Sequence, residues 1–149
     1  MSGPSGREAV ANPRILERSF MKTALVCIGL LGLLLFGLGF AVSLMRGRTN
    51  TIAGSSGEPS DSLHKLIRAH GNTAEYVAML AILIFLVGTR SPATWALWCM
   101  GIATASRYLI AAGLILSPTI EQPHPLRFVG AIGTYLSGFA LCVALLVSL

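Results

Sequence analysis

Charged side chains are scarce in this sequence. Asp, Glu, Lys and Arg together make up 11% of the 149 residues, whereas 54% of the residues are hydrophobic. A soluble globular domain carries about 25% charged residues, so this composition argues against one. The scarcity of charge and the long apolar stretches together indicate a chain whose solvent is lipid.

Cysteine is also rare, and clusters of basic residues are missing. Cys27, Cys99 and Cys142 each lie alone in an apolar block, without a second Cys or a His at the spacing of a metal site. We therefore expect no metal site and find no disulfide framework. The net charge of +5 comes from Lys and Arg scattered singly. A nucleic-acid backbone requires a basic stripe, so nucleic acid is not expected as a partner.

Uncharged runs are what the sequence has in abundance. Thr23–Met45 contains no charged residue and is long enough to cross a hydrocarbon core of about 30 Å. A cleaved signal peptide is the competing interpretation, because a basic leader precedes the run. The run is too long for that, and it ends without a small-residue cleavage site, which favours a retained span. Residues 1–22, rich in Gly, Ser and Pro, are expected to form a flexible tail.

Capping residues mark the starts of the second and third helices. Ser60, Asp61 and Ser62 follow a polar connection, and any of them can cap the second helix. Ser91 and Pro92 fit the N-cap and the first position of a third helix. The sequence thus predicts an all-α, integral membrane four-helix bundle over residues 23–149, with spans at about 23–45, 63–88, 92–116 and 126–148. Basic residues are divided evenly between the two sides, so they do not orient the bundle.

Glu75 and Arg107 are the charged residues that lie well inside predicted spans. An ionisable group at such a depth costs at least a few kcal/mol unless it is paired or hydrated. Counted from the tight turn between the second and third spans, Glu75 lies about 18 Å deep and Arg107 about 22 Å deep. The two side chains should therefore lie at similar depths in the bilayer. An ion pair that only fixes helix register and a ligand site are both compatible with this placement.

Further polar residues gather toward the same face of the membrane. His64, Arg68, Asn72 and Glu75 recur at intervals of four, four and three residues, which places them on one helix face. Tyr76, Arg107, Tyr108 and Arg127 add more polar groups than a single ion pair needs, whereas Tyr135 is interpreted as a packing residue. Because Arg forks suit carboxylates, the pattern favours a pocket for a small anion.

The element Arg68-Ala-His-Gly-Asn72-Thr-Ala-Glu75-Tyr76, with Arg107-Tyr108 in the third span and Arg127 opening the fourth, resembles the MAPEG family of membrane-bound glutathione-handling proteins. The resemblance extends over about residues 20–149. It implies a homotrimer with glutathione, as co-substrate, bound between neighbouring subunits near the cytosolic face. It also implies that a lipophilic small molecule reaches the site laterally through the membrane lipid.

The resemblance assigns roles to individual residues. It implies that glutathione is held by Arg68, Asn72, Glu75, Tyr76 and Arg107, with Arg46 as a further candidate. Tyr108 and Arg127 would be catalytic, because a guanidinium beside the sulfur favours the thiolate over the thiol. A second tyrosine expected one turn after Tyr108 is absent, and Ala111-Ala112 stands there instead.

Two functions follow from these residues. The first is a membrane-bound glutathione transferase or peroxidase-like enzyme that conjugates glutathione to lipophilic electrophiles. The alternative is a noncatalytic MAPEG-like membrane protein that binds glutathione or a partner, and the missing tyrosine favours it. A transporter is less well supported, since the sequence shows neither internal repeats nor a pair of broken spans.

Overall fold

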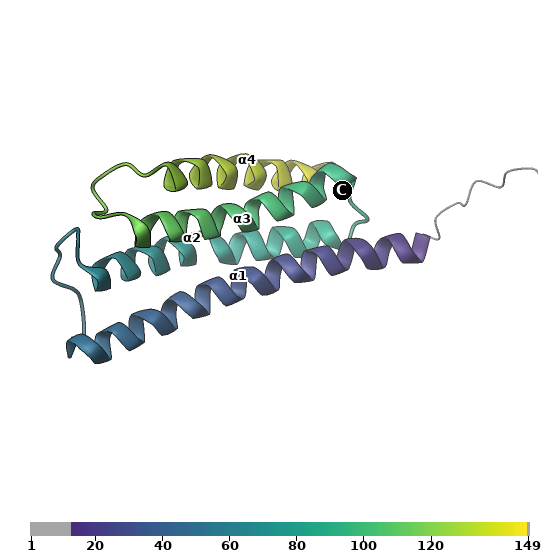
Figure 1. The fold of residues 1–149 in the computed structure, drawn as a ribbon. Helices are drawn as coiled ribbons and strands as arrows, with labels where there is room; N and C mark the ends of the chain where they lie inside the picture. The colour runs from purple at the N-terminus through teal and green to yellow at the C-terminus, as the bar shows by residue number, and fades with distance from the viewer. Residues whose placement is uncertain (1–12, 149) are drawn as a thin grey trace, which may run out of the picture.

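The computed structural model of the chain describes the backbone of residues 13–148 and the side chains of residues 18–148. The described part consists of four helices and contains no strand (Figure 1): α1 (Pro13–Thr49), α2 (Ser62–Gly88), α3 (Thr94–Leu116) and α4 (Pro125–Val147). All four helices are long and apolar enough to cross a membrane. The predicted all-α bundle of four spans is confirmed.

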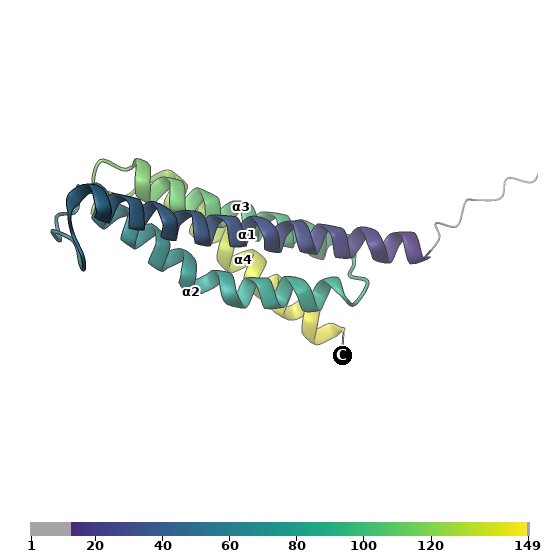
Figure 2. The same ribbon diagram turned by 90° about the horizontal axis from the view of Figure 1, so that it is seen from below.

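Successive helices run antiparallel, so the connections gather at the two ends of the bundle (Figures 1 and 2). One end, here called the loop end, carries the α1–α2 and α3–α4 connections. The other, the turn end, carries the tight α2–α3 turn and the end of α4. At the loop end, the Ile120 amide donates to the Pro59 carbonyl over 3.0 Å. Lys65 Nζ also donates to the Ser117 carbonyl over 3.1 Å. These bonds tie the two long connections together.

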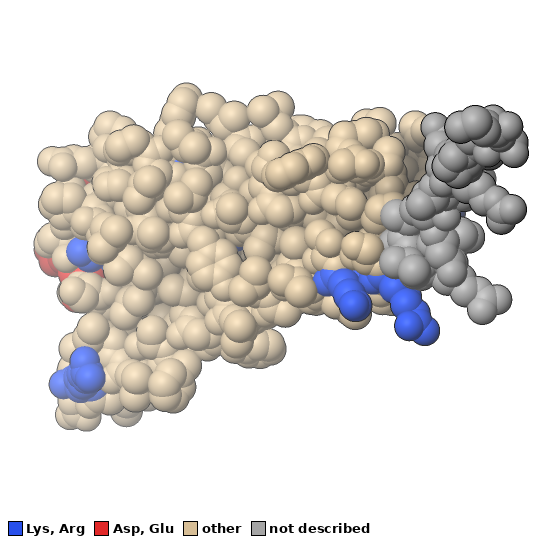
Figure 3. Space-filling model, turned by 45° about the vertical axis from the view of Figure 1, so that its right-hand side comes forward, with Lys and Arg blue, Asp and Glu red and all other residues tan. Residues whose placement is uncertain are grey.

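The outer surface is apolar between the two ends. Figure 3 shows charged side chains gathered at the ends of the face that it draws, with a broad uncharged band between them. Large apolar side chains are exposed on the helices, including Phe36 of α1 at 77% and Phe139 of α4 at 70%. An exposed apolar surface of this extent requires lipid or another protein to cover it. The chain is therefore an integral, multi-pass membrane protein.

Two helices begin at positions that differ from the sequence-based expectation. Residues 13–22, assigned to the tail, are helical and form the first turns of α1, while residues 1–12 lie outside the described part. No Gly or Pro interrupts the chain between Pro13 and Gly29, and proline is tolerated in a first helical turn. The third helix begins at Thr94 rather than at Pro92, because Ser91 has φ +48° and Ala93 is extended. The residues expected to start this helix, Ser91 and Pro92, therefore belong to the tight turn instead.

Side-chain caps define the starts of the other two helices. The Asp61 carboxylate accepts from the Leu63 amide over 3.2 Å and the His64 amide over 3.3 Å. Asp61 is thus the N-cap among the three candidates that the sequence left open. His124 Nδ1 accepts from the Leu126 amide over 3.3 Å, with Pro125 at the first position of α4. Both caps lie at the loop end and fix where α2 and α4 enter the bilayer.

The cap of α2 should make stability depend on pH. The Ser56 hydroxyl, which donates to Asp61 Oδ2 over 2.9 Å, lowers the pKa of Asp61, and the two capping amides lower it further. A depressed carboxyl pKa gives stability that is present above the unfolded-state value and is lost as the pH falls through the folded value. We expect the Tm advantage of the protein over its Asp61→Asn variant to shrink below about pH 4. Thermal unfolding in detergent measures it, and a constant difference would contradict the assignment.

Glycine allows α4 to lie close against α3. A Cβ on Gly130 would be 2.8 Å from the Ser106 carbonyl oxygen and 2.6 Å from Ile110 Cγ1. Only a residue without a side chain fits at this distance from another helix backbone. The close approach places Thr134, one turn further along α4, among the residues that surround Arg107. The packing of α3 on α4 therefore shapes the region where the polar side chains meet.

Candidate functional site

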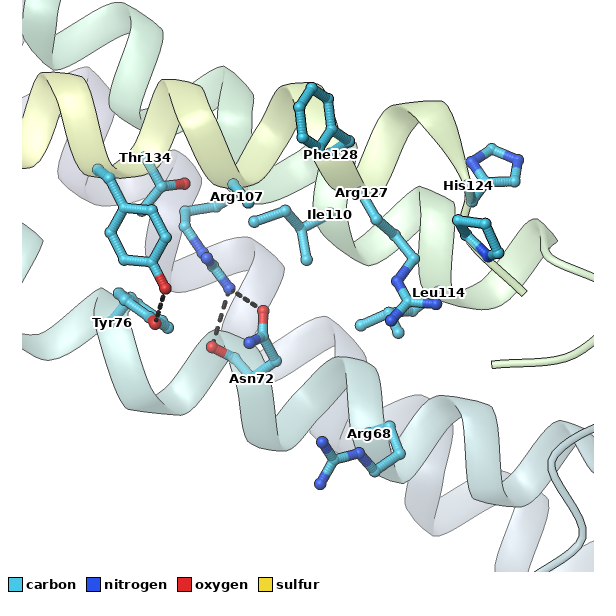
Figure 4. Close-up of a pocket in the computed structure, with 13 residues that line it drawn as sticks. Arg68, Asn72, Tyr76, Arg107, Ile110, Leu114, His124, Arg127, Phe128 and Thr134 are labelled. Atoms are coloured by element: carbon cyan, nitrogen blue, oxygen red, sulfur yellow. Dashed lines mark hydrogen bonds between the residues drawn. The ribbon is translucent and has the colours of Figure 1, made fainter. Parts of the chain in front are cut away.

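A cavity of about 350 Å³ lies between α2, α3 and α4 toward the loop end (Figure 4). Its volume falls within the range of about 300–1,000 Å³ that is usual for small-molecule sites. Residues of all three helices and of the α3–α4 connection line it: Arg68, Asn72, Tyr76, Arg107, Ile110, Leu114, Pro123, His124, Arg127, Phe128, Ala131, Thr134 and Tyr135. Three arginines from three different helices thus border one space.

Arg107 lies at the deep side of the cavity and is 1% exposed. Its Nη2 donates to Asn72 Oδ1 over 2.6 Å and to the Asn72 carbonyl over 2.8 Å. The guanidinium carbon also lies 4.7 Å from the centroid of the Tyr76 ring, which stabilises the cation through the face of the ring. Both hydrogen bonds join α3 to α2, and neither partner carries a formal charge. The positive charge of Arg107 therefore remains available to an anion.

Two buried polar atoms beside the cavity lack a hydrogen-bond partner. Arg107 Nε and Thr134 Oγ1 are both buried and unpaired within the described part of the chain. A buried polar group without a partner typically costs about 1–3 kcal/mol. Since both residues line the cavity, a ligand there that both accepts and donates hydrogen bonds would satisfy them. This observation points to a polar ligand rather than to a purely apolar one.

The other two arginines lie nearer the loop end. Arg127 Nη1 donates to the carbonyls of Ile120 and Gln122 over 2.7 Å and 3.3 Å. These bonds hold the guanidinium over the α3–α4 connection, and Figure 4 shows it in the space between α4 and α2. Arg68, on α2, is exposed at the border of the cavity. The predicted convergence of cationic groups from the second, third and fourth helices is present in the structure.

The predicted site residues do not all reach the cavity. Glu75 is exposed and lies beside a separate apolar groove, while Arg107 bonds to Asn72 one turn away. Glu75 and Arg107 do have similar heights, but the ion pair considered from the sequence is not how Arg107 is held. Tyr108 turns toward α1, where its hydroxyl donates to the Leu30 carbonyl over 2.8 Å. Arg46 Nη1 donates to the Ile52 carbonyl over 3.1 Å, within the α1–α2 connection.

Two residues of α4 that carry hydroxyl groups were not expected in the site. Thr134 lines the cavity with an unpaired hydroxyl, and Tyr135 lines it as well instead of serving only as packing. The Tyr135 and Tyr76 hydroxyls lie 2.9 Å apart, and the rings meet edge to face with centroids 6.0 Å apart. Thr134 follows Arg127 by seven residues, which is two helical turns on the same face. That spacing is the sequence signal that could have identified Thr134.

Fold and cavity together define an integral membrane protein in which three spans share a cavity bordered by three arginines. A profile of the MAPEG family matches residues 24–147, which cover all four spans. The chain belongs to the MAPEG family, whose members include glutathione transferases and related proteins. The same comparisons returned no curated protein and no solved structure similar to this chain.

Proposed function

We propose that the protein is a membrane-bound glutathione transferase or peroxidase-like enzyme that joins glutathione to lipophilic electrophiles. One observation carries the proposal: Arg107 and Thr134 have buried, unpaired polar atoms beside a cavity bordered by three arginines. Family membership supports the same ligand class. Glutathione is a small peptide with two carboxylates, one ammonium group and a thiol, so it needs cationic and amide partners together.

The cavity offers partners for each part of this ligand. Arg68 can take a carboxylate with two parallel N–H donors. Arg107, whose Nη2 already donates to Asn72, can attract a second carboxylate with its charge and bond to it through its remaining N–H groups. Asn72 and the Thr134 hydroxyl can bond to the peptide amides and carbonyls. Occupation of the site would give Arg107 Nε and Thr134 Oγ1 the partners that they lack. Binding thus gains both charge pairing and the satisfaction of buried groups.

Arg127 is the proposed thiolate-stabilising residue. Its Nη1 is anchored on two loop carbonyls, which fixes the guanidinium at the border of the cavity. A fixed positive charge beside a thiol lowers the free energy of the thiolate relative to the thiol, and the thiolate is the nucleophile. The proton released from sulfur passes to water at the loop end. An electrophile or a hydroperoxide oxygen would then be attacked by the sulfur.

A homotrimer is part of this proposal. Glu75 and Tyr108 are exposed on the single chain, so a neighbouring subunit could cover them and bring them to a shared site. The broad apolar surface of α1 and α4 offers area for such contacts. The Glu75 carboxylate would then suit the ammonium group of glutathione. Arg46 is a further candidate for this shared site.

Arg127→Ala tests the chemical role of this arginine. We expect kcat for conjugation of a generic aryl halide to fall about tenfold or more, while Kd for glutathione changes much less. The reason is that the charge favours the thiolate more than it favours the bound thiol. Turnover and calorimetric titration in detergent give the two numbers. Arg48→Ala removes an exposed arginine at the end of α1 and is the matched control. Unchanged kcat in Arg127→Ala would remove this residue from the mechanism.

A noncatalytic glutathione-binding protein is the second candidate. The Arg127 guanidinium already donates to two loop carbonyls, and Ala112 stands where a second tyrosine was expected. Both features are compatible with a pocket that binds without turnover. Calorimetric titration combined with a turnover assay separates the candidates. Binding with no conjugation of any electrophile class supports this second function, whereas conjugation supports the first.

A further inference from the structure

A second, apolar space adjoins the cationic cavity. It is a groove of about 310 Å³ between α2 and α4, lined by Glu75, Tyr76, Met79, Leu80, Leu83, Thr134, Tyr135, Gly138, Phe139 and Cys142. Tyr76, Thr134 and Tyr135 line both spaces. The cavity lies toward the loop end, whereas the groove continues along α2 and α4 toward the turn end. The pair of tyrosines therefore stands at the boundary between a polar space and an apolar one.

Tyr135 occupies an unusual depth for a tyrosine in a membrane span. It lies ten residues after the start of α4, about 15 Å into a helix that is about 35 Å long. Membrane tyrosines gather at the interfaces, where the hydroxyl meets water. Tyr135 is instead near the middle of the span, where it is 51% exposed and lines the apolar groove. Its depth calls for a partner inside the protein.

Tyr76 is that partner, and one hydroxyl hydrogen of the pair makes no hydrogen bond within the described part of the chain. The two hydroxyls lie 2.9 Å apart and share one hydrogen bond. Two hydroxyls carry two hydrogens, and within the described part no other acceptor bonds to either of them. The remaining O–H can therefore donate to a ligand atom. Arg107, 4.7 Å from the Tyr76 ring centroid, adds positive charge beside the pair.

We propose that Tyr135 is a catalytic proton donor when the reacting carbon of the electrophile is bonded to oxygen, and an epoxide is used here as the test electrophile. This inference rests on the proposed transferase function. The apolar body of the epoxide lies in the groove, and its oxygen lies beside the Tyr135 hydroxyl. Glutathione occupies the cavity, so its sulfur and the epoxide carbon meet at the boundary that the tyrosines form.

The step balances without a further reactant. The thiolate sulfur forms a bond to one epoxide carbon, and the carbon–oxygen bond breaks with its electron pair passing to oxygen. That oxygen takes the proton of Tyr135, while the Tyr76 hydroxyl donates to the resulting phenolate. Water returns the proton that the thiol released earlier, which restores Tyr135. The product is a thioether with a neighbouring hydroxyl group. An aryl halide, by contrast, expels a halide ion and needs no proton.

Tyr135→Phe tests the inference in the full-length protein in detergent, with an aliphatic epoxide and a generic aryl halide as the two electrophiles. We expect the ratio of epoxide kcat to aryl-halide kcat to fall at least about tenfold, because general acid catalysis contributes about 10²–10⁴-fold. Tyr135→Leu, which removes the ring as well, is the second variant. If the hydroxyl matters, the two variants should lower the ratio by similar factors.

The possible outcomes separate this inference from the function on which it rests. A ratio that is unchanged in Tyr135→Phe but lowered in Tyr135→Leu would show that the ring only shapes the groove, and it would overturn the proposal. Equal losses with both electrophiles would assign a structural role to the pair and also overturn it. Wild-type protein that conjugates the aryl halide but no epoxide would exclude the proton donor while leaving the transferase function intact. Wild-type protein that conjugates neither would remove both.

Discussion

Arg107→Met is expected to weaken glutathione binding about a hundredfold. Arg107 is 1% exposed. In the described structure its guanidinium donates to Asn72 and contacts the Tyr76 ring, and both of these groups are neutral. A carboxylate bound there would gain a charge-assisted hydrogen bond in a poorly hydrated site. Such a bond contributes up to about 3 kcal/mol, which corresponds to a factor of about one hundred in Kd. Calorimetric titration of glutathione into the purified protein measures the change.

Two further variants test whether the loss of glutathione affinity is specific to the guanidinium of Arg107. Arg90→Met removes an exposed arginine at the turn end, whose Nη1 donates to the Ser148 carbonyl, and it should leave Kd unchanged. Arg107→Lys keeps the charge but loses the planar fork, so an intermediate Kd is expected. Thermal unfolding establishes that each variant is folded. A folded Arg107→Met protein with the Kd of the wild type would show that glutathione does not bind in this cavity.

Gly130→Ala is expected to lower the stability of the protein, because it disturbs the packing of α4 against α3. The added Cβ would lie 2.8 Å from the Ser106 carbonyl oxygen, so α4 must move away from α3. Overpacking of this kind costs about 1–3 kcal/mol, which outweighs the gain of about 1 kcal/mol in helix propensity. The packing that places Thr134 near Arg107 is disturbed at the same time. We expect glutathione affinity to fall together with Tm.

Gly138→Ala is the matched control on the same helix. Its Cβ would meet only Leu80 Cδ2, at 3.9 Å, which is ordinary van der Waals contact. Both variants gain the same helix propensity, so the comparison isolates the clash. We expect the Tm of Gly130→Ala to be about 5 °C below that of Gly138→Ala in the same detergent. Equal melting temperatures would contradict the close packing of α3 and α4.

The membrane fold could be predicted because its signals are local. Uncharged runs of sufficient length and the capping candidates around Asp61 are read from neighbouring residues alone. The ten-residue difference at the start of α1 arose because a Gly- and Pro-rich composition was extended over a segment that has neither after Pro13. The start of α3 shifted by two residues, because the φ of +48° at Ser91 is imposed by the turn.

The candidate site could be predicted only where one helix carries the pattern. The spacing of Arg68 and Asn72 along α2 places them on one face, and the structure has both at the cavity. The partner of Arg107 depends on how α3 is rotated against α2, and this rotation selects Asn72 rather than Glu75. The same rotation turns Tyr108 toward Leu30. Packing between helices, which sequence spacing does not encode, also brings Tyr135 to Tyr76.

The ultraviolet absorbance of the glutathione thiolate tests the central claim most directly. Purified protein in detergent is titrated with glutathione at neutral pH, where free thiol predominates because its ordinary pKa is about 8.5. A cavity that binds glutathione beside Arg127 should give a thiolate signal that saturates with glutathione, and the signal should be lost in Arg127→Ala. Folded wild-type protein that gives no thiolate signal at any glutathione concentration would contradict the proposed enzyme.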